Sequence, residues 1–196
     1  LDSTNFITIS KLDIQRTSYT TLFDIIKSKN LAYPLSLGFY GQNNSFSFFG
    51  AFPRSLSTRW SNTPNNAQDI GIFNLSQFPP EQIENAQIFI GSDAIILSNN
   101  ANGALINFQE SIYNTKNPYS KLVYSQASDD FLGADGVYSQ NFANNWNFSL
   151  GFRILSTPGR FTNSKLQTWN FRASVRYNFD SLTSISISEN YSHYSV

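Results

Sequence analysis

The strongest constraint in this sequence is the alternation of apolar and polar residues in its C-terminal half. From Trp146 to Ile154 every second residue is bulky and apolar, and the residues between them are small or polar. The segment 168–179 repeats this pattern. Because successive side chains of a β-strand point to opposite faces, the pattern predicts strands with one apolar and one polar face.

The apolar and polar sets suggest different surroundings for the two faces. The predicted strands run for about 10 to 12 residues, longer than the usual ~5–6, and aromatic residues gather at their ends. Long alternating strands bounded by aromatic girdles are typical of membrane barrels. We therefore expect one set to face lipid and another to face an aqueous lumen. The lipid-facing set is Trp146, Phe148, Leu150, Phe152, Trp169, Phe171 and Val175, and the lumen-facing set is Arg153, Arg172 and Arg176. A soluble sandwich with a solvated polar face is the alternative.

Composition excludes several classes of protein. The 13 basic and 13 acidic residues balance, which argues against a general nucleic-acid binder. The chain has no cysteine, so disulfides, zinc–thiolate sites and thiol nucleophiles are excluded. His193 is the sole histidine and lacks a serine and an aspartate at a recognisable spacing. We expect no catalytic residues, metal site or cofactor, and thus no enzyme.

The N-terminal half mixes short helices and strands. Ser10 is expected to cap a helix over 11–15, and Thr20 or Thr21 to cap one over 21–29. A short helix is expected to begin at Pro79 or Pro80, and a one-turn helix after Ser92 or Asp93. Strands are predicted at 6–9, 45–51, 55–60, 85–91 and 104–108, and then, joined by turns, at 119–127, 136–142, 146–156, 168–179 and 182–194.

Residues 73–108 carry a family resemblance, and IENAQIFIGSDAIILSNNANGALINF is their last part, residues 83–108. This segment resembles the closing part of the plug domain of TonB-dependent outer-membrane receptors, and the resemblance extends over about residues 5 to 110. The chain departs from the family pattern at Phe49-Gly50, which has no arginine before the glycine, and at Ile90-Gly91-Ser92, where the family usually has R-G-P. No energy-coupling box is recognisable before residue 5. The matching motif residues are Ile83, Glu84, Gly91, Gly103, Ile106 and Asn107.

The resemblance implies an α+β plug domain followed by antiparallel transmembrane β-barrel strands, a partial barrel. Residues 1–112 would form the plug-like domain, and 113–196 the first strands of the barrel, about five. Because the family's barrels have 22 strands, we expect the chain to be a fragment.

The resemblance also implies a function. The chain would belong to a receptor or transporter in the outer membrane of a Gram-negative bacterium that takes up a scarce solute, such as a siderophore, cobalamin or an oligosaccharide. Its partners would be outer-membrane lipid, a small solute and an inner-membrane energy-transducing TonB-type protein, with no nucleic acid. We expect a ligand loop that contains Tyr40, Gln42, Asn43 and Asn44. The alternative is that these residues form a plain polar surface loop.

Two other hypotheses stay open at this point. One is a porin-like or structural outer-membrane β-protein with a degenerate plug and no energy-coupled transport, which the missing arginines favour. The other is a soluble β-rich glycan-binding module.

Overall fold

The chain folds into two compact units. The structure is a computed structural model that describes residues 6–38, 43–67, 71–128, 130–159, 164–180 and 182–195. One unit comprises Leu1–Ser76 with Ile83–Ser111, and the other comprises Gln77–Gln82 with Ile112–Val196. The sequence placed 77–82 in the N-terminal domain, but these residues make their contacts with the C-terminal strands. The assignment of 1–112 as a plug stays a prediction.

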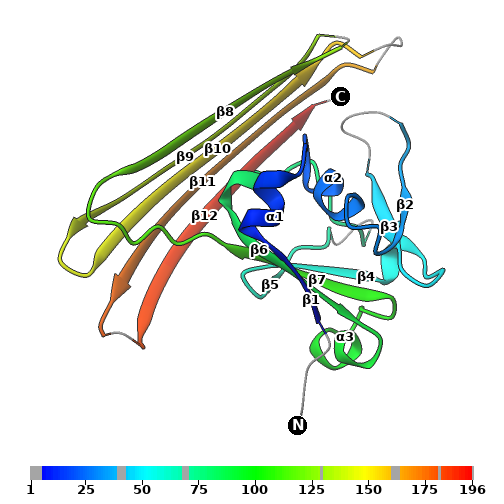
Figure 1. The fold of residues 1–196 in the computed structure, drawn as a ribbon, viewed down its shortest axis with the longest axis horizontal. Coiled ribbons are helices and arrows are strands. Elements are labelled where there is room, and N and C mark those ends of the chain that lie inside the picture. Colours follow the sequence, from blue (N-terminus) through cyan, green and yellow to red (C-terminus); the bar gives the residue numbers. More distant parts are fainter. Residues whose placement is uncertain are drawn as a thin grey trace. The chain divides into compact units, whose positions relative to one another are not determined.

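The N-terminal unit is built on a five-stranded sheet with the order β1-β6-β7-β4-β5 (Figure 1). Strand β4 runs parallel to β7, and the other neighbours are antiparallel. A separate small hairpin pairs β2 with β3. The strands are β1 Phe6–Ser10, β2 Tyr33–Leu35, β3 Ser45–Ser47, β4 Leu56–Trp60, β5 Thr63–Pro64, β6 Ile83–Ile90 and β7 Ala104–Glu110.

The helices of this unit are short, and their caps follow from the sequence. Ser10 forms a capping box with Asp13 at the start of α1, and Thr21 forms one with Asp24 at the start of α2, as predicted. Gly91, at φ +67°, precedes α3 instead of the expected Ser92 or Asp93. The helices are α1 Lys11–Arg16, α2 Leu22–Lys27 and α3 Ser92–Leu97, with 3-10 turns η1 Pro53–Ser55 and η2 Pro80–Gln82, the last belonging to the C-terminal unit. Among the described residues, no helix is long and apolar enough to cross a membrane.

The core of the N-terminal unit lies where α2 and the sheet bury apolar residues. Phe23 of α2 stacks on Phe46 of β3 with ring centroids 4.7 Å apart. Phe108 of β7 lies 6.3 Å from the rings of both Trp60 and Phe73. The first five residues of β7 are all buried, which accounts for the continuous apolar character of ALINF.

The C-terminal unit is an antiparallel meander whose strands pair in chain order, β8 to β12 (Figure 1). The five predicted strands are confirmed, although β9 begins five residues earlier than expected, at Phe131. Ala143–Trp146 forms a tight turn with Asn145 at φ +69°, a conformation that asparagine tolerates. The strands are β8 Tyr119–Ala127, β9 Phe131–Ala143, β10 Trp146–Thr157, β11 Leu166–Asn178 and β12 Ser184–Ser195.

The two faces of this meander differ as the alternation predicts. On one face, which we call the apolar face, Phe152, Trp169 and Phe171 are exposed by 38%, 47% and 49%. On the opposite, polar face, Arg153 and Arg172 are buried, at 0% and 7%. The apolar face of β8–β11 carries no charged residue among those described. The meander thus exposes aromatic side chains on one face and buries Arg153 and Arg172 on the other.

Candidate functional site

The candidate site is the polar face of strands β8 to β11. The pairing registers place Lys121, Val137, Gly151 and Arg172 opposite one another in one row across four strands. The next row contains Val123, Asp135, Arg153 and Asn170. These two rows bring together charged side chains that lie up to 51 positions apart in the sequence.

Asp135 and Arg153 form a buried ion pair in the second row. One guanidinium nitrogen of Arg153 donates to both carboxylate oxygens of Asp135, at 2.9 and 2.8 Å. Both side chains are almost fully removed from solvent. The register of the β9–β10 hairpin accounts for this pair, because it sets the two residues directly opposite each other.

The 3-10 turn η2 lies against this polar face. The Glu81 carboxylate, only 5% exposed, accepts a hydrogen bond from the ammonium group of Lys121. The Gln82 side chain lies over Gly151, where an added Cβ would be 1.1 Å from Nε2 of Gln82 and 2.3 Å from its Cδ. Any residue larger than glycine at 151 would therefore displace Gln82.

A hydrogen-bond network continues from this site toward the turn between β9 and β10. The backbone oxygen of Tyr113 accepts hydrogen bonds from Ser139 Oγ at 3.3 Å and from Asn147 Nδ2 at 2.9 Å. The Tyr113 hydroxyl donates to the backbone oxygen of Glu81 at 3.5 Å, and its ring stacks on Tyr119 at 4.0 Å. The segment that leads into β8 is thus fixed to the polar face.

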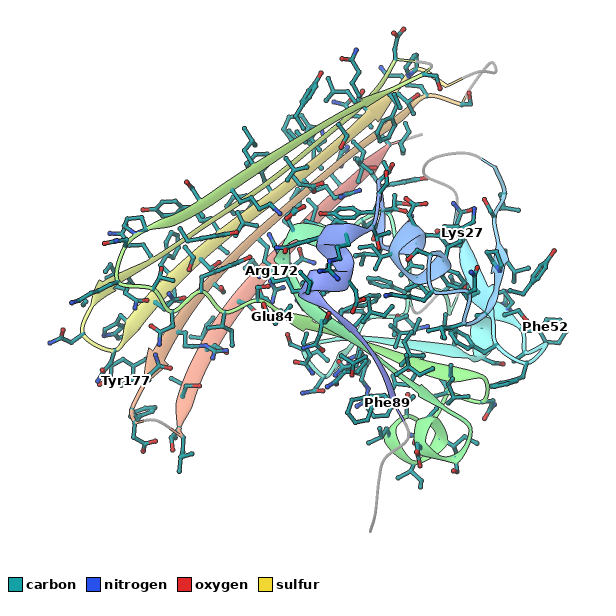
Figure 2. The ribbon with its side chains drawn as sticks, viewed as in Figure 1. Lys27, Phe52, Glu84, Phe89, Arg172 and Tyr177 are labelled. Atoms are coloured by element: carbon teal, nitrogen blue, oxygen red, sulfur yellow. The ribbon has the colours of Figure 1, made fainter. Side chains whose placement is uncertain are left out.

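Four aromatic rings cluster at the same end of the apolar face. The ring centroids of Phe142 and Trp146 are 5.9 Å apart, and those of Trp146 and Tyr177 are 4.9 Å apart. Tyr177 meets Phe179 edge-on at 4.9 Å. Figure 2 shows Tyr177 near the C-terminal end of β11 and Arg172 further back along the same strand. These four residues form what we call the aromatic cluster.

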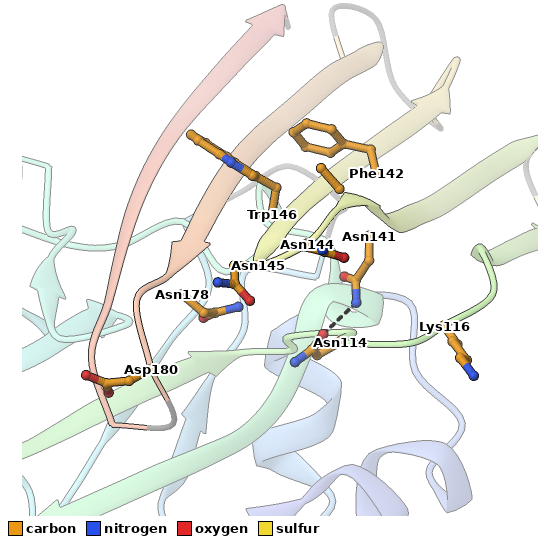
Figure 3. A pocket seen from close by; sticks show the side chains of 10 residues that line it. Asn114, Lys116, Asn141, Phe142, Asn144, Asn145, Trp146, Asn178 and Asp180 are labelled. Carbon is orange, nitrogen blue, oxygen red and sulfur yellow. Dashed lines mark hydrogen bonds between the residues drawn. The ribbon is translucent and has the colours of Figure 1, made fainter.

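An open hollow of about 830 Å³ lies at this turn end (Figure 3). Five asparagines line it, and Lys116 and Asp180 lie on opposite sides of it in the view of Figure 3. The backbone N–H groups of Leu182 and Thr183 donate to Asp180 and lower the pKa of its carboxyl. The asparagines are Asn114, Asn141, Asn144, Asn145 and Asn178. Within the described ranges, no three His, Asp or Glu side chains lie close enough to hold a metal ion.

Comparison with known proteins gives the family. Residues 74–181 match the family model described as "Putative porin", which is more than half of the chain. The chain belongs to the Putative porin family. No curated protein matches this porin-family chain.

Solved structures share the fold of this porin-family chain at low sequence identity. The ferric enterobactin receptor PfeA of Pseudomonas aeruginosa is 15% identical, with a TM-score of 0.74 over 98% of this chain and 33% of that one. The copper transporter OprC is 13% identical, with a TM-score of 0.76 over 95% and 30%. The pyoverdine outer membrane receptor FpvA of Pseudomonas aeruginosa PAO1 is 11% identical, with a TM-score of 0.76 over 96% and 27%. The chain therefore spans about a third or less of the length of these receptors, and at such identities the likeness concerns the fold alone.

The predicted face residues of the porin-family chain lie on two opposite faces. The lipid-facing set lies on the apolar face, where each member is exposed or half-buried. Arg153 and Arg172 lie buried on the polar face, and Arg176 is half-buried on it. Contact with lipid and with a lumen stays a prediction for both sets.

The predicted plug-motif residues hold structural positions in the N-terminal unit. Ile83 and Ile106 are buried in β6 and β7. Glu84 accepts hydrogen bonds from Lys11 Nζ and Ser111 Oγ, both at 3.0 Å. A Cβ at Gly103 would lie 2.9 Å from the Cβ of Ala51, so glycine permits this close approach. Buried Asn107 donates to Asn62 at 2.9 Å and to Gln87 at 3.2 Å.

The expected ligand loop is only partly described. Tyr40 and Gln42 lie outside the described residues. Asn43 is exposed, and Asn44 Oδ1 accepts a hydrogen bond from the Leu37 backbone at 2.9 Å. Ligand binding by this loop stays a prediction.

Sequence reasoning missed five residues of the polar site. The missed residues are Glu81, Gln82, Lys121, Asp135 and Gly151. Counting outward from the Ala143–Trp146 turn would have paired Asp135 with Arg153, given the bulge beside Trp146. No comparable signal links Glu81 to Lys121, because their contact depends on tertiary structure.

Proposed function

We propose that residues 113–196 form part of the wall of a β-barrel in the outer membrane of a Gram-negative bacterium. In this proposal the barrel transports a solute, and residues 1–112 act as its plug. The observation that carries the proposal is the contrast between the two faces of β8–β11. One face is exposed, apolar and free of charge, and the other buries an arginine–aspartate pair.

Several features of the strands support contact with lipid. Strands β9 to β12 contain 12 or 13 residues, enough to cross a bilayer, for which tilted strands need ~9–11. The aromatic cluster lies beside the short turn Ala143–Trp146, and aromatic girdles mark the membrane interface in barrels. In such barrels the short turns are periplasmic, which would put this end on the periplasmic side.

Segment 77–82 supports the assignment of a plug. This segment belongs to residues 1–112 in sequence, yet two contacts attach it to the polar face. They are the Glu81–Lys121 ion pair and the close packing of Gln82 on Gly151. Contacts of this kind obstruct a lumen and can still be broken without unfolding the wall. The solute would be small, of the siderophore, cobalamin or oligosaccharide class, with Tyr40, Gln42, Asn43 and Asn44 in its binding loop. A TonB-type inner-membrane protein would supply the energy.

A porin-like protein without energy coupling is the second candidate. The family description favours it. Phe49-Gly50 and Ile90-Gly91-Ser92 also favour it, because both lack the arginine found in TonB-dependent receptors.

Liposome swelling by the full-length protein, with and without residues 1–112, tests both candidates. A plugged transporter should admit small sugars only after the deletion, whereas a porin-like protein should admit them in both forms. Heat-modifiable electrophoretic migration would show that each form has assembled. A full-length protein that stays monodisperse in detergent-free buffer would refute both candidates.

A further inference from the structure

The polar-face row that contains Gly151 is basic. Lys121 and Arg172 lie in this row on either side of Val137 and Gly151, and the row contains no acidic residue. Three strand spacings separate the two cations, about 14 Å between their backbones. Because both side chains are long, their charged groups can approach one ligand above Gly151.

The carboxylate nearest to this row belongs to η2 and not to the wall. Asp135 is the sole acidic residue on the polar face of the described strands, and it binds Arg153 in the neighbouring row. Lys121 instead pairs with Glu81. Departure of η2 would remove the carboxylate that is hydrogen-bonded to Lys121.

The side-chain amide of Gln82 lies over Gly151 and forms no hydrogen bond with the described residues. Its side chain is buried, and neither Nε2 nor Oε1 has a hydrogen-bond partner among the described residues. A buried amide without partners is unfavourable, because it has lost its hydrogen bonds to water. η2 therefore places the Glu81 carboxylate, which is paired with Lys121, beside the Gln82 amide, which lacks hydrogen-bond partners among the described residues.

We propose that Lys121, Gly151 and Arg172 form a binding site for a multiply charged carboxylate solute, and that Glu81 occupies this site when the solute is absent. The solute's carboxylates would replace Glu81 at Lys121 and extend over Gly151 toward Arg172. Its binding would release η2 from the wall. This inference rests on the proposed function, because it assumes that solute reaches the polar face through a lumen.

Hydrogen exchange of the full-length protein in detergent tests the inference, with citrate as the probe. At constant ionic strength, citrate should speed exchange of the backbone amides of Glu81 and Gln82 several-fold, and neutral sucrose should not. In Lys121→Gln the same two amides should exchange fast without citrate, and citrate should not speed their exchange further. Lys165→Gln removes an exposed lysine outside the row and should behave like the unaltered protein.

Two variants separate competition from misfolding. Gly151→Ala should displace Gln82 without changing any charge, so the Glu81 and Gln82 amides should exchange faster even without citrate. Glu81→Gln should bind citrate several-fold more tightly in calorimetry, because the competing carboxylate is gone. Sodium chloride with the same effect as citrate, an undiminished response in Lys121→Gln, or unchanged citrate affinity in Glu81→Gln would overturn the proposal. Exchange in detergent needs no transport, so a failed swelling assay would not decide this test.

Discussion

Replacing Asp135 with asparagine removes the carboxylate that pairs with Arg153 on the polar face. Arg153 is fully buried, so its charge would stay in a protein environment without the carboxylate that now accepts two hydrogen bonds from it. Breaking a buried ion pair by removing one partner costs about 3–5 kcal/mol. Neither side chain is exposed enough for solvent screening to reduce this figure much.

The expected loss can be measured by denaturant unfolding in detergent. About 3–5 kcal/mol corresponds to a change of roughly 10²- to 10⁴-fold in the unfolding equilibrium. Heat-modifiable migration would report the folded fraction, and the fluorescence of Trp146 and Trp169 would report the strands. Arg176→Gln changes a half-buried arginine of the same face and should cost less than about 1 kcal/mol.

A double variant distinguishes loss of the pair from general disturbance. Asp135→Leu combined with Arg153→Met removes both charges and should be neutral or stabilising by about 1–4 kcal/mol. The reasoning fails if Asp135→Asn costs less than about 1 kcal/mol, or if the double variant is as unstable as the single one.

Two further predictions concern the apolar face and the N-terminal unit. Leu150→Arg, near the middle of β10, should destabilise the protein in lipid by about 2–4 kcal/mol, and Trp146→Arg, at the strand end, by only about 0–1 kcal/mol. Unfolding in lipid vesicles measures both costs, and equal costs would contradict a bilayer around this face. The Lys29 ammonium group and Ser10 lower the pKa of the Asp13 carboxyl, so its stabilising effect is complete above its ordinary pKa of about 4 and is lost as the pH falls toward the lowered value. The protection of the α1 amides, corrected for the intrinsic pH dependence of amide exchange, should therefore fall below about pH 4, and Asp13→Asn should remove most of this fall.

Periodicity and capping account for what the sequence predicted well. The alternation around Trp146 and Trp169 identified the strands and their faces. This works because every second side chain of a strand lies on the same face, so two different faces give an alternating sequence. Ser10 and Thr21 were identified as possible caps because such residues satisfy backbone groups that a helix start leaves free. In the structure the Ser10 hydroxyl accepts from the Asp13 N–H, and the Asp24 carboxylate accepts from the Thr21 N–H.

Features that depend on distant contacts or on special backbone geometry escaped the sequence analysis. Strand β2 contains Pro34, which argues against a strand and is tolerated here because β2 pairs on one side only. The contact of Gln82 with Gly151 has no local signature, because a glycine within a strand can equally mark a bulge or a tight bend. Arg153 and Arg172 were therefore visible as arginines in an alternating pattern. The other strand residues of the site and the two from η2 were not.

The pairing order of the two units has a consequence for folding. In the meander every strand pairs with its neighbour in the sequence, so each hairpin needs only contacts that are close in the sequence. In the N-terminal sheet, by contrast, Ile9 of β1 pairs with Ala86, and β4 pairs only with β7 and β5. Strand β1 therefore cannot pair until β6 is available, so this sheet depends on contacts between distant parts of the sequence that the meander does not need.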